Sequence, residues 1–123
     1  RELQPSILVN ERMHGYGDFS TPECRIPGTA PTGMWEVVDT WDIAGRWGFA
    51  EPFVNRPASW VADRLGEVTA LGGNYMINVA PQADGTLPQV VTGDFVWLAQ
   101  WRQWSTEALA SRGRLPDHVT CNV

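Results

Sequence analysis

Lysine is missing from this chain of 123 residues, so its nine basic side chains are all arginine. The acidic side chains outnumber them and give a formal net charge of −5 at pH 7. Proteins that bind nucleic acids present clustered positive charge to the phosphates. This acidic chain shows no such cluster in its sequence, and we therefore expect no nucleic-acid partner.

Long apolar runs are also missing. A helix that crosses a membrane needs roughly 18 or more consecutive apolar residues, and no run in the chain reaches that length. No signal-peptide pattern is visible either. We therefore expect no membrane partner.

Cysteine and histidine are scarce. The two cysteines, Cys24 and Cys121, are too far apart in sequence to suggest a metal site or a redox pair. A disulfide between them stays open, although Cys24 is more typical of a small filler residue. The only histidines are His14 and His118, and the sequence gives neither of them a role.

The length of the chain limits the fold. A chain of 123 residues supports one modest domain, whereas a complete eight-fold β/α barrel needs roughly 250 residues and at least about 200. The first residue is Arg1 rather than Met, and a strand-like run follows almost at once. We expect a fragment that cannot close such a barrel by itself.

Short apolar runs predict strands in three places. These runs are residues 6–10, 35–41 and 75–79. The first two are separated by residues 14–34, which are rich in Gly, Pro, Ser and Thr and are typical of a long loop. A second irregular segment, 42–55, follows the second strand.

Apolar residues at helical spacing predict two helices, at residues 57–71 and 88–110. In the second helix, one apolar stripe is expected to face the core. It consists of Trp97, Trp101, Trp104 and Ala108, widened by Val91, Phe95 and Leu98. Strands that alternate with helices predict an α/β fold with a parallel sheet. We expect one domain over residues 1–110 and an irregular tail over 111–123.

The long loop holds the strongest candidate for chemistry. A single carboxylate, Glu23, closes the run Gly17-Asp18-Phe19-Ser20-Thr21-Pro22. A loop of this length without regular structure is usually either functional or evidence against the assignment of the elements, and the presence of Glu23 and the nearby Arg12 favours function. Barrel enzymes carry their catalytic groups on loops at the C-terminal ends of strands, which is the position predicted for Glu23.

Two blocks of sequence resemble the α-L-fucosidase family of glycoside hydrolases (family 29 type). The first is residues 10–23, which begins Asn-Glu-Arg and ends at Glu23, and the second is residues 72–81 followed by Asp84-Gly85. Both resemble the later half of that family's catalytic barrel. The resemblance implies a partial TIM-like (β/α)8 barrel with the later strands and helices only.

The resemblance leaves two candidates for the acid/base residue. In some members the role belongs to the residue that matches Glu23, and in others to the glutamate of a Trp-Glu pair, here Trp35-Glu36. The alternatives are a surface glutamate for Glu23 and a hydrogen-bonding role alone for Glu36. Both residues are predicted to be catalytic, and the choice between them stays open.

The resemblance also implies substrate-binding residues, namely Arg12, Trp47 and Trp35. Arg12 would contact fucose hydroxyls or the nucleophile, and Trp47 would pack on the methyl group of fucose. Glu11 stands where the family more often has Asp or Asn, and Arg46 replaces a serine. The alternatives are a structural Arg–Glu pair and a Trp47 that belongs to the core.

The implied activity is that of a retaining exo-α-L-fucosidase, which hydrolyses terminal α-L-fucose from oligosaccharides without metal or cofactor. Such an enzyme needs a second carboxylate as nucleophile, and no aspartate of the chain has the family's motif. We therefore expect the isolated chain to be inactive and to need the missing N-terminal half of the barrel. The resemblance favours a secreted or periplasmic location. The alternative is a non-catalytic sugar-binding or vestigial fragment.

Overall fold

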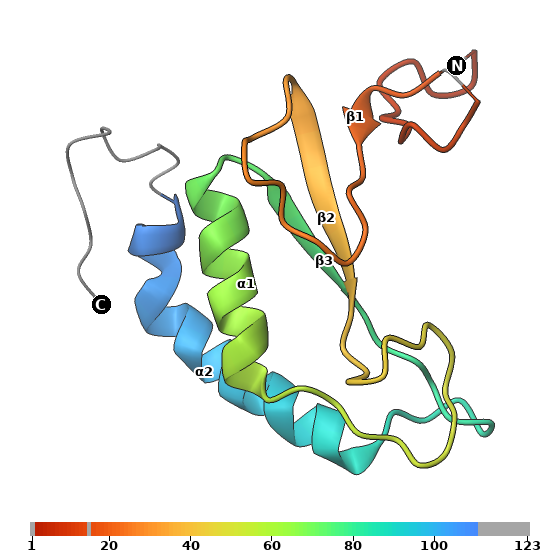
Figure 1. Ribbon diagram of the computed structural model, residues 1–123, viewed down its shortest axis with the longest axis vertical. Coiled ribbons are helices and arrows are strands. Elements are labelled where there is room, and N and C mark those ends of the chain that lie inside the picture. Colours follow the sequence, from red (N-terminus) through yellow and green to blue (C-terminus); the bar gives the residue numbers. More distant parts are fainter. Residues whose placement is uncertain (1, 15, 111–123) are drawn as a thin grey trace.

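The computed structural model describes residues 2–14 and 16–110. The described elements are β1 (Phe19–Ser20), β2 (Met34–Thr40), α1 (Ala58–Ala70), β3 (Asn74–Asn78) and α2 (Gln89–Ala110). They form a small α/β unit in which both helices lie on the same side of a three-stranded parallel sheet (Figure 1). The prediction of an α/β fold with a parallel sheet is confirmed.

The register of the sheet determines which side chains share a face. Phe19 pairs with Met34, and Glu36 pairs with Asn74. The chain continues in line with β1, because Glu23 forms an isolated parallel bridge with Val38. Side chains alternate between the two faces along a strand, and partners in a parallel register point the same way. The sheet therefore has one face toward the helices and one face away from them.

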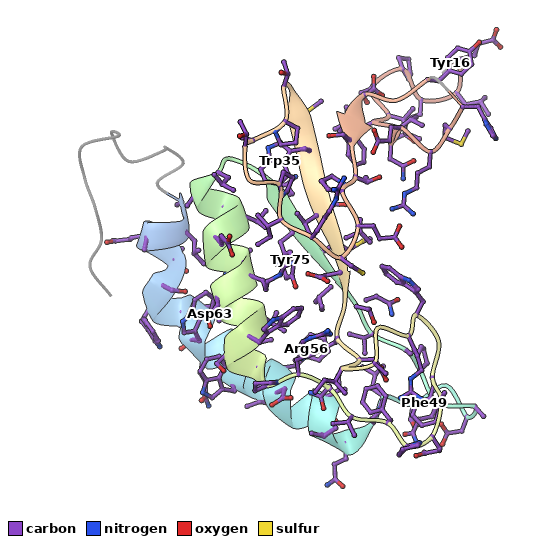
Figure 2. All side chains as sticks on the ribbon, viewed as in Figure 1. Tyr16, Trp35, Phe49, Arg56, Asp63 and Tyr75 are labelled. Carbon is purple, nitrogen blue, oxygen red and sulfur yellow. The ribbon has the colours of Figure 1, made fainter. Side chains whose placement is uncertain are left out.

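The face toward the helices holds the core. Val37 of β2 is fully buried against Val68 of α1, and Trp41, directly after β2, packs against Val91 of α2. Tyr75 of β3 joins both groups of core residues and lies between the sheet and α1 (Figure 2). The four buried side chains come from elements that the apolar pattern predicted.

The predicted helices and two of the predicted strands are confirmed to within one residue at each end. Helix 57–71 is observed as Ala58–Ala70, and strand 35–41 as Met34–Thr40. After α1, Gly72 adopts a positive φ of 81° and the amide of Gly73 donates to the carbonyl of Val68. This geometry closes the helix and turns the chain toward β3.

The strand predicted at residues 6–10 is wrong. Only Asn10 pairs with the sheet, through an isolated bridge to Phe19, and the side chains of Ile7 and Leu8 are exposed. Ile7 is 39% exposed and Leu8 is 59% exposed, so their apolar character is used for burial only in part. The loop predicted at 14–34 is correspondingly shorter, because it contains β1.

The expectation that the tryptophan stripe of α2 faces the core is correct only in part. Trp104 is 74% exposed and Trp97 is 42% exposed, whereas Val91 and Ser105 are buried. Two adjacent stripes of this helix are apolar, and periodicity alone does not say which one meets the sheet. The helix buries the stripe that contains Val91, Leu98, Trp101 and Ser105 and leaves Trp97 and Trp104 at its side.

Three expectations fall outside the described residues. They are the irregular tail at residues 111–123, the domain boundary at residue 110 and a disulfide between Cys24 and Cys121. All three stay predictions, because residues 111–123, which include His118 and Cys121, are not described. Within residues 2–14 and 16–110, no helix is long and apolar enough to cross a membrane.

Candidate active site

The two candidate acid/base residues lie on the same face of the sheet, the one turned away from the helices. Glu36 is level with Asn74, whereas Glu23 is level with Val38, two residues further along the strand direction. At about 3.3 Å per residue, this places Glu23 about 7 Å nearer the C-terminal edge of the sheet. Active sites of parallel β/α barrels lie at that edge, which favours Glu23 over Glu36.

Glu23 and Arg12 form a direct ion pair. Nη2 of Arg12 lies 2.6 Å from Oε2 of Glu23, and Nε of Arg12 donates to the hydroxyl of Thr21 at 3.1 Å. The side chains are 49% and 42% exposed, so a molecule in solution reaches both. The structure therefore brings together a carboxylate and a guanidinium that are eleven residues apart in sequence.

The turn that carries Arg12 is held by carboxylates that the sequence did not single out as useful. The Glu11 carboxylate accepts a hydrogen bond from the backbone amide of Thr21 at 2.8 Å. The Asp18 carboxylate accepts one from the amide of Val9 at 2.9 Å. Sequence reasoning treated Glu11 as a departure from the family motif, whereas here it joins the Arg12 turn to the strand that leads to Glu23.

A close backbone approach explains one glycine of this loop. A Cβ atom on Gly17 would lie 2.5 Å from the Cα atom of Glu11, which no side chain tolerates. Glycine at this position lets the two arms of the loop touch. The loop is thus folded on itself before it reaches Glu23.

Glu36 is placed differently from Glu23. It lies nearer the N-terminal end of β2 and lines a cavity of about 270 Å³ together with Leu8, Phe19, Met34 and Asn74. No hydrogen bond or ion pair of Glu36 with Arg12 is present among the described residues. The structure therefore does not bring Glu36 together with Arg12 and Glu23.

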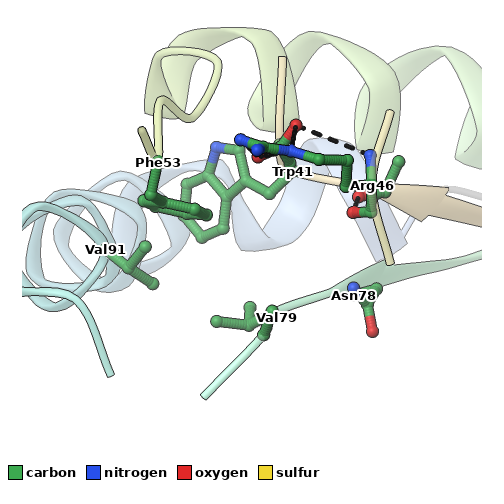
Figure 3. A pocket seen from close by; sticks show the side chains of 9 residues that line it. Trp41, Arg46, Phe53, Asn78, Val79 and Val91 are labelled. Carbon is green, nitrogen blue, oxygen red and sulfur yellow. Dashed lines mark hydrogen bonds and ion pairs between the residues drawn. The ribbon is translucent and has the colours of Figure 1, made fainter. Parts of the chain in front are cut away.

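Trp47 lies on the loop between β2 and α1, at the C-terminal edge of the sheet. The residue is 40% exposed, and its backbone carbonyl accepts a hydrogen bond from Nδ2 of Asn78 at 2.9 Å. The same loop contains a paired carboxylate, because Arg46 Nη2 donates to Asp42 Oδ2 at 2.7 Å. Hydrogen bonding to Arg46 lowers the pKa of Asp42 below its ordinary value, although burial acts in the opposite direction. Figure 3 shows Arg46 and Asn78 among the side chains that line a pocket at the ends of β2 and β3.

Trp35 lies on the other face of the sheet from Glu23. Only 4% of Trp35 is exposed, and its ring packs with Val68 against α1. A Cβ atom on Gly73 would meet the indole at 2.6 Å. This placement makes Trp35 a packing residue and gives its predicted contact with substrate no support.

In the part of the chain that the structure describes, no group of three or more His, Cys, Asp or Glu side chains is arranged to hold a metal ion. Cys24 directly follows Glu23 and is exposed, with a positive φ of 55°.

Comparison with known proteins adds a family to this geometry. The family model described as alpha-L-fucosidase matches residues 1–107. The chain belongs to the alpha-L-fucosidase family. This finding supports the resemblance that was based on residues 10–23 and 72–81, and it supports the terms glycosidase and hydrolase for the family.

Several fucosidases are similar to this chain. The tissue alpha-L-fucosidase of Mus musculus is 23% identical over 116 residues, which cover 87% of this chain and 25% of that protein. The human tissue alpha-L-fucosidase is 22% identical over 116 residues, with the same shares. Among solved structures, alpha-L-fucosidase isoenzyme 1 from Paenibacillus thiaminolyticus matches with a TM-score of 0.76 at 22% identity, over 85% of this chain and 26% of that chain.

The match covers only a small part of each relative, so the family name describes a fragment and not a whole enzyme. This chain spans about a quarter of the length of the curated fucosidases. Another solved alpha-L-fucosidase gives the same result, with a TM-score of 0.77, 26% identity and coverage of 87% and 25% of the two chains. The similarity supports a fucosidase-like fragment whose structural neighbours are TIM-like barrels.

Proposed function

We propose that this chain supplies the acid/base half of a retaining exo-α-L-fucosidase active site, as the later part of a (β/α)8 barrel of the family 29 type. The observation that carries the proposal is the Arg12–Glu23 pair, 2.6 Å between Nη2 and Oε2, on the open face near the C-terminal edge of the sheet. Family membership supplies the class of substrate, a terminal α-L-fucoside.

In this proposal Glu23 acts twice. It first gives a proton to the glycosidic oxygen as the bond to the leaving group breaks, and it then takes a proton from the water that releases fucose. Arg12 binds the ionised form of Glu23 between these steps and donates to sugar oxygens through its remaining N–H groups. Trp47 provides an apolar wall for the C6 methyl group. No metal or cofactor takes part.

The nucleophile of this mechanism has to come from outside the described residues. Each described aspartate with a buried or ordered carboxylate is already engaged elsewhere. Asp39 pairs with Arg64 on the helix face at 2.6 Å, Asp42 pairs with Arg46, and Asp84 accepts from Thr86 within a turn. We therefore propose that a preceding part of the barrel supplies the second carboxylate and that the isolated chain does not turn over substrate.

The open face of the sheet, which is turned away from the helices, also supports a preceding part of the barrel as the partner. Met34 and Met76 point away from the helices and are about half exposed. In a closed barrel, side chains on that face fill the interior. We propose that the N-terminal half of the barrel covers this face and that a fucosylated oligosaccharide is the substrate.

A hydrolysis assay tests the proposal. The purified chain is expected to release no nitrophenol from p-nitrophenyl α-L-fucoside above the rate of a buffer blank. The reading frame upstream of Arg1 is expected to encode further strands and an aspartate nucleophile, and the longer protein is expected to be active. Normal turnover by the 123-residue chain, or an unrelated sequence directly upstream, would contradict the proposal.

Fucose binding by the isolated chain and activity of the longer protein together distinguish the proposed function from the non-catalytic alternative. Fucose binding by the isolated chain that survives Glu23→Gln and is lost in Trp47→Ala, with no activity in the longer protein, would indicate a sugar-binding fragment. The proposed function predicts instead that Glu23→Gln removes activity from a longer protein that still binds fucose.

A further inference from the structure

Hydrogen bonds from Arg46 connect the start and the end of the loop that carries Trp47. The guanidinium of Arg46 donates from Nη2 to Oδ2 of Asp42 at 2.7 Å and to the carbonyl of Pro52, also at 2.7 Å. Asp42 is almost completely buried at the start of the loop, and Pro52 lies near its end. One side chain therefore fixes the span of the loop, but it does not orient the peptide next to Trp47.

That peptide is held by the ends of two neighbouring strands. The hydroxyl of Thr40, the last residue of β2, donates to the carbonyl of Arg46 at 2.6 Å. Nδ2 of Asn78, the last residue of β3, donates to the next carbonyl, that of Trp47, at 2.9 Å. Thr40 and Asn78 are register partners, so both donors leave the sheet on the same face and at the same level.

The indole itself has less support than its backbone. Trp47 is 40% exposed, whereas Trp41 at the start of the same loop is 1% exposed. A half-exposed indole is not fixed by close packing on all sides. Its position therefore depends on where the two carbonyl contacts hold the main chain.

We infer that Asn78 is a positioning residue for Trp47, which sets the distance between the indole and the C6 position of a bound α-L-sugar. This inference rests on the proposed function, because it assumes that Trp47 faces the sugar methyl group. The consequence is selectivity for a 6-deoxy sugar over the same sugar with a C6 hydroxyl. Asn78 does not need to touch the substrate for this effect.

The test replaces the donor of Asn78 without changing its size. Asn78→Asp keeps the shape of the side chain but removes the Nδ2 donor and places a carboxylate against the Trp47 carbonyl. The 123-residue chain is labelled with 5-fluorotryptophan, and Trp47→Phe identifies the fluorine resonance of Trp47. We expect Asn78→Asp to move or broaden this resonance by more than its line width, while the resonances of Trp41 and Trp35 stay in place.

Asn74→Asp is the matched control, because it makes the same substitution at the other end of β3. This variant is expected to leave the Trp47 resonance unchanged. A Trp47 resonance that is identical in Asn78→Asp and wild type, in a folded protein, would overturn the inference. If Asn78→Asp does not fold, hydrogen exchange in the wild-type chain decides, since the Nδ2 protons of Asn78 should exchange more slowly than those of Asn74. Equal exchange would overturn the inference.

A titration of the same labelled protein separates this inference from the proposed function. Methyl α-L-fucoside is expected to shift the wild-type Trp47 resonance at a lower concentration than methyl α-L-galactoside, and Asn78→Asp is expected to lose that difference. One outcome is that neither sugar shifts the Trp47 resonance, although the Asn78→Asp substitution does change it. In that case Asn78 positions Trp47, but the assignment of Trp47 to the fucose methyl group fails. If fucoside shifts it equally in wild type and Asn78→Asp, the positioning role fails.

Discussion

The two faces of the sheet differ in packing and in chemistry. On the helix face, Val37 and Trp41 are buried against α1 and α2. On the opposite face, Met34 is half exposed and Glu23 forms an ion pair with Arg12 that solvent reaches. The comparison shows that this chain builds its core on one face, and the proposed function assigns the other face to a partner and a substrate. Substitutions on the two faces should therefore affect different properties.

The largest effect on stability is expected from Trp41 on the helix face. Its indole Nε1 donates to the carbonyl of Arg56 at 2.6 Å, and its ring meets Phe95 edge to face with centroids 5.3 Å apart. Trp41→Ala should lower the free energy of unfolding in urea by about 3–5 kcal/mol. Trp104→Ala, the same change at a 74% exposed position, should cost about 1 kcal/mol at most. Equal losses would contradict the assignment of the core to one face.

A smaller effect is expected where α1 turns toward β3. Gly73→Ala would place a methyl group 2.6 Å from the indole of the buried Trp35. We expect a loss of about 1–3 kcal/mol in the free energy of unfolding, measured by urea titration, because the core has to shift. Gly66→Ala within α1 meets no atom within 4 Å. It should gain up to about 1 kcal/mol from helix propensity, so the same substitution has opposite signs at two positions of one segment.

The helix face should also show a pH dependence in alkali. Burial raises the pKa of Tyr75 above its ordinary value of 10.0, and the charge of Asp39 raises it further. A phenol that holds its proton more tightly when folded contributes stability below the unfolded pKa and loses it as the pH rises above 10. We expect urea unfolding to show this decline in wild type and a weaker decline in Tyr75→Phe. The absence of lysine simplifies the comparison, since no ammonium group titrates in this range.

The smallest effect on stability is expected from Glu23→Gln on the open face. The Arg12–Glu23 pair is about half exposed, and pairs of this kind contribute roughly 1 kcal/mol or less. Asp39→Asn removes the buried partner of Arg64 on the helix face and should cost about 3 kcal/mol in the same urea titration. A large loss for Glu23→Gln would mean that the pair serves the fold rather than a substrate.

Local patterns in the sequence predicted most of the elements. The spacing of Val61 and Val68 predicted α1, and both residues are buried. The apolar residues of 6–10 and two tryptophans of α2, Trp97 and Trp104, gave wrong predictions, because burial depends on which neighbours are present and not on periodicity alone. Ile7 and Trp104 are residue types that are common in cores, yet Ile7 is 39% exposed and Trp104 is 74% exposed.

The candidate site was predicted in part. A motif placed Arg12 and Glu23 in one loop, and the structure joins them directly. The contacts of Glu11 with Thr21 and of Asn78 with Trp47 could not be predicted, because they depend on strand register and on the path of long loops. The opposite faces of Trp35 and Glu36 follow from alternation along β2, which the sequence could have indicated once the strand was predicted.

The measurement that tests the central claim most directly compares Glu23→Ala and Glu36→Ala, on two α-L-fucosides, in the longer, active protein that the proposed function predicts. One substrate has an alkyl leaving group that needs a proton, and the other has a 2,4-dinitrophenyl leaving group that does not. We predict that Glu23→Ala loses far more activity on the first substrate than on the second and that added azide restores part of its turnover. Glu36→Ala should affect both substrates alike. The reverse pattern, with selective loss in Glu36→Ala, would contradict the assignment of Glu23 as the acid/base residue.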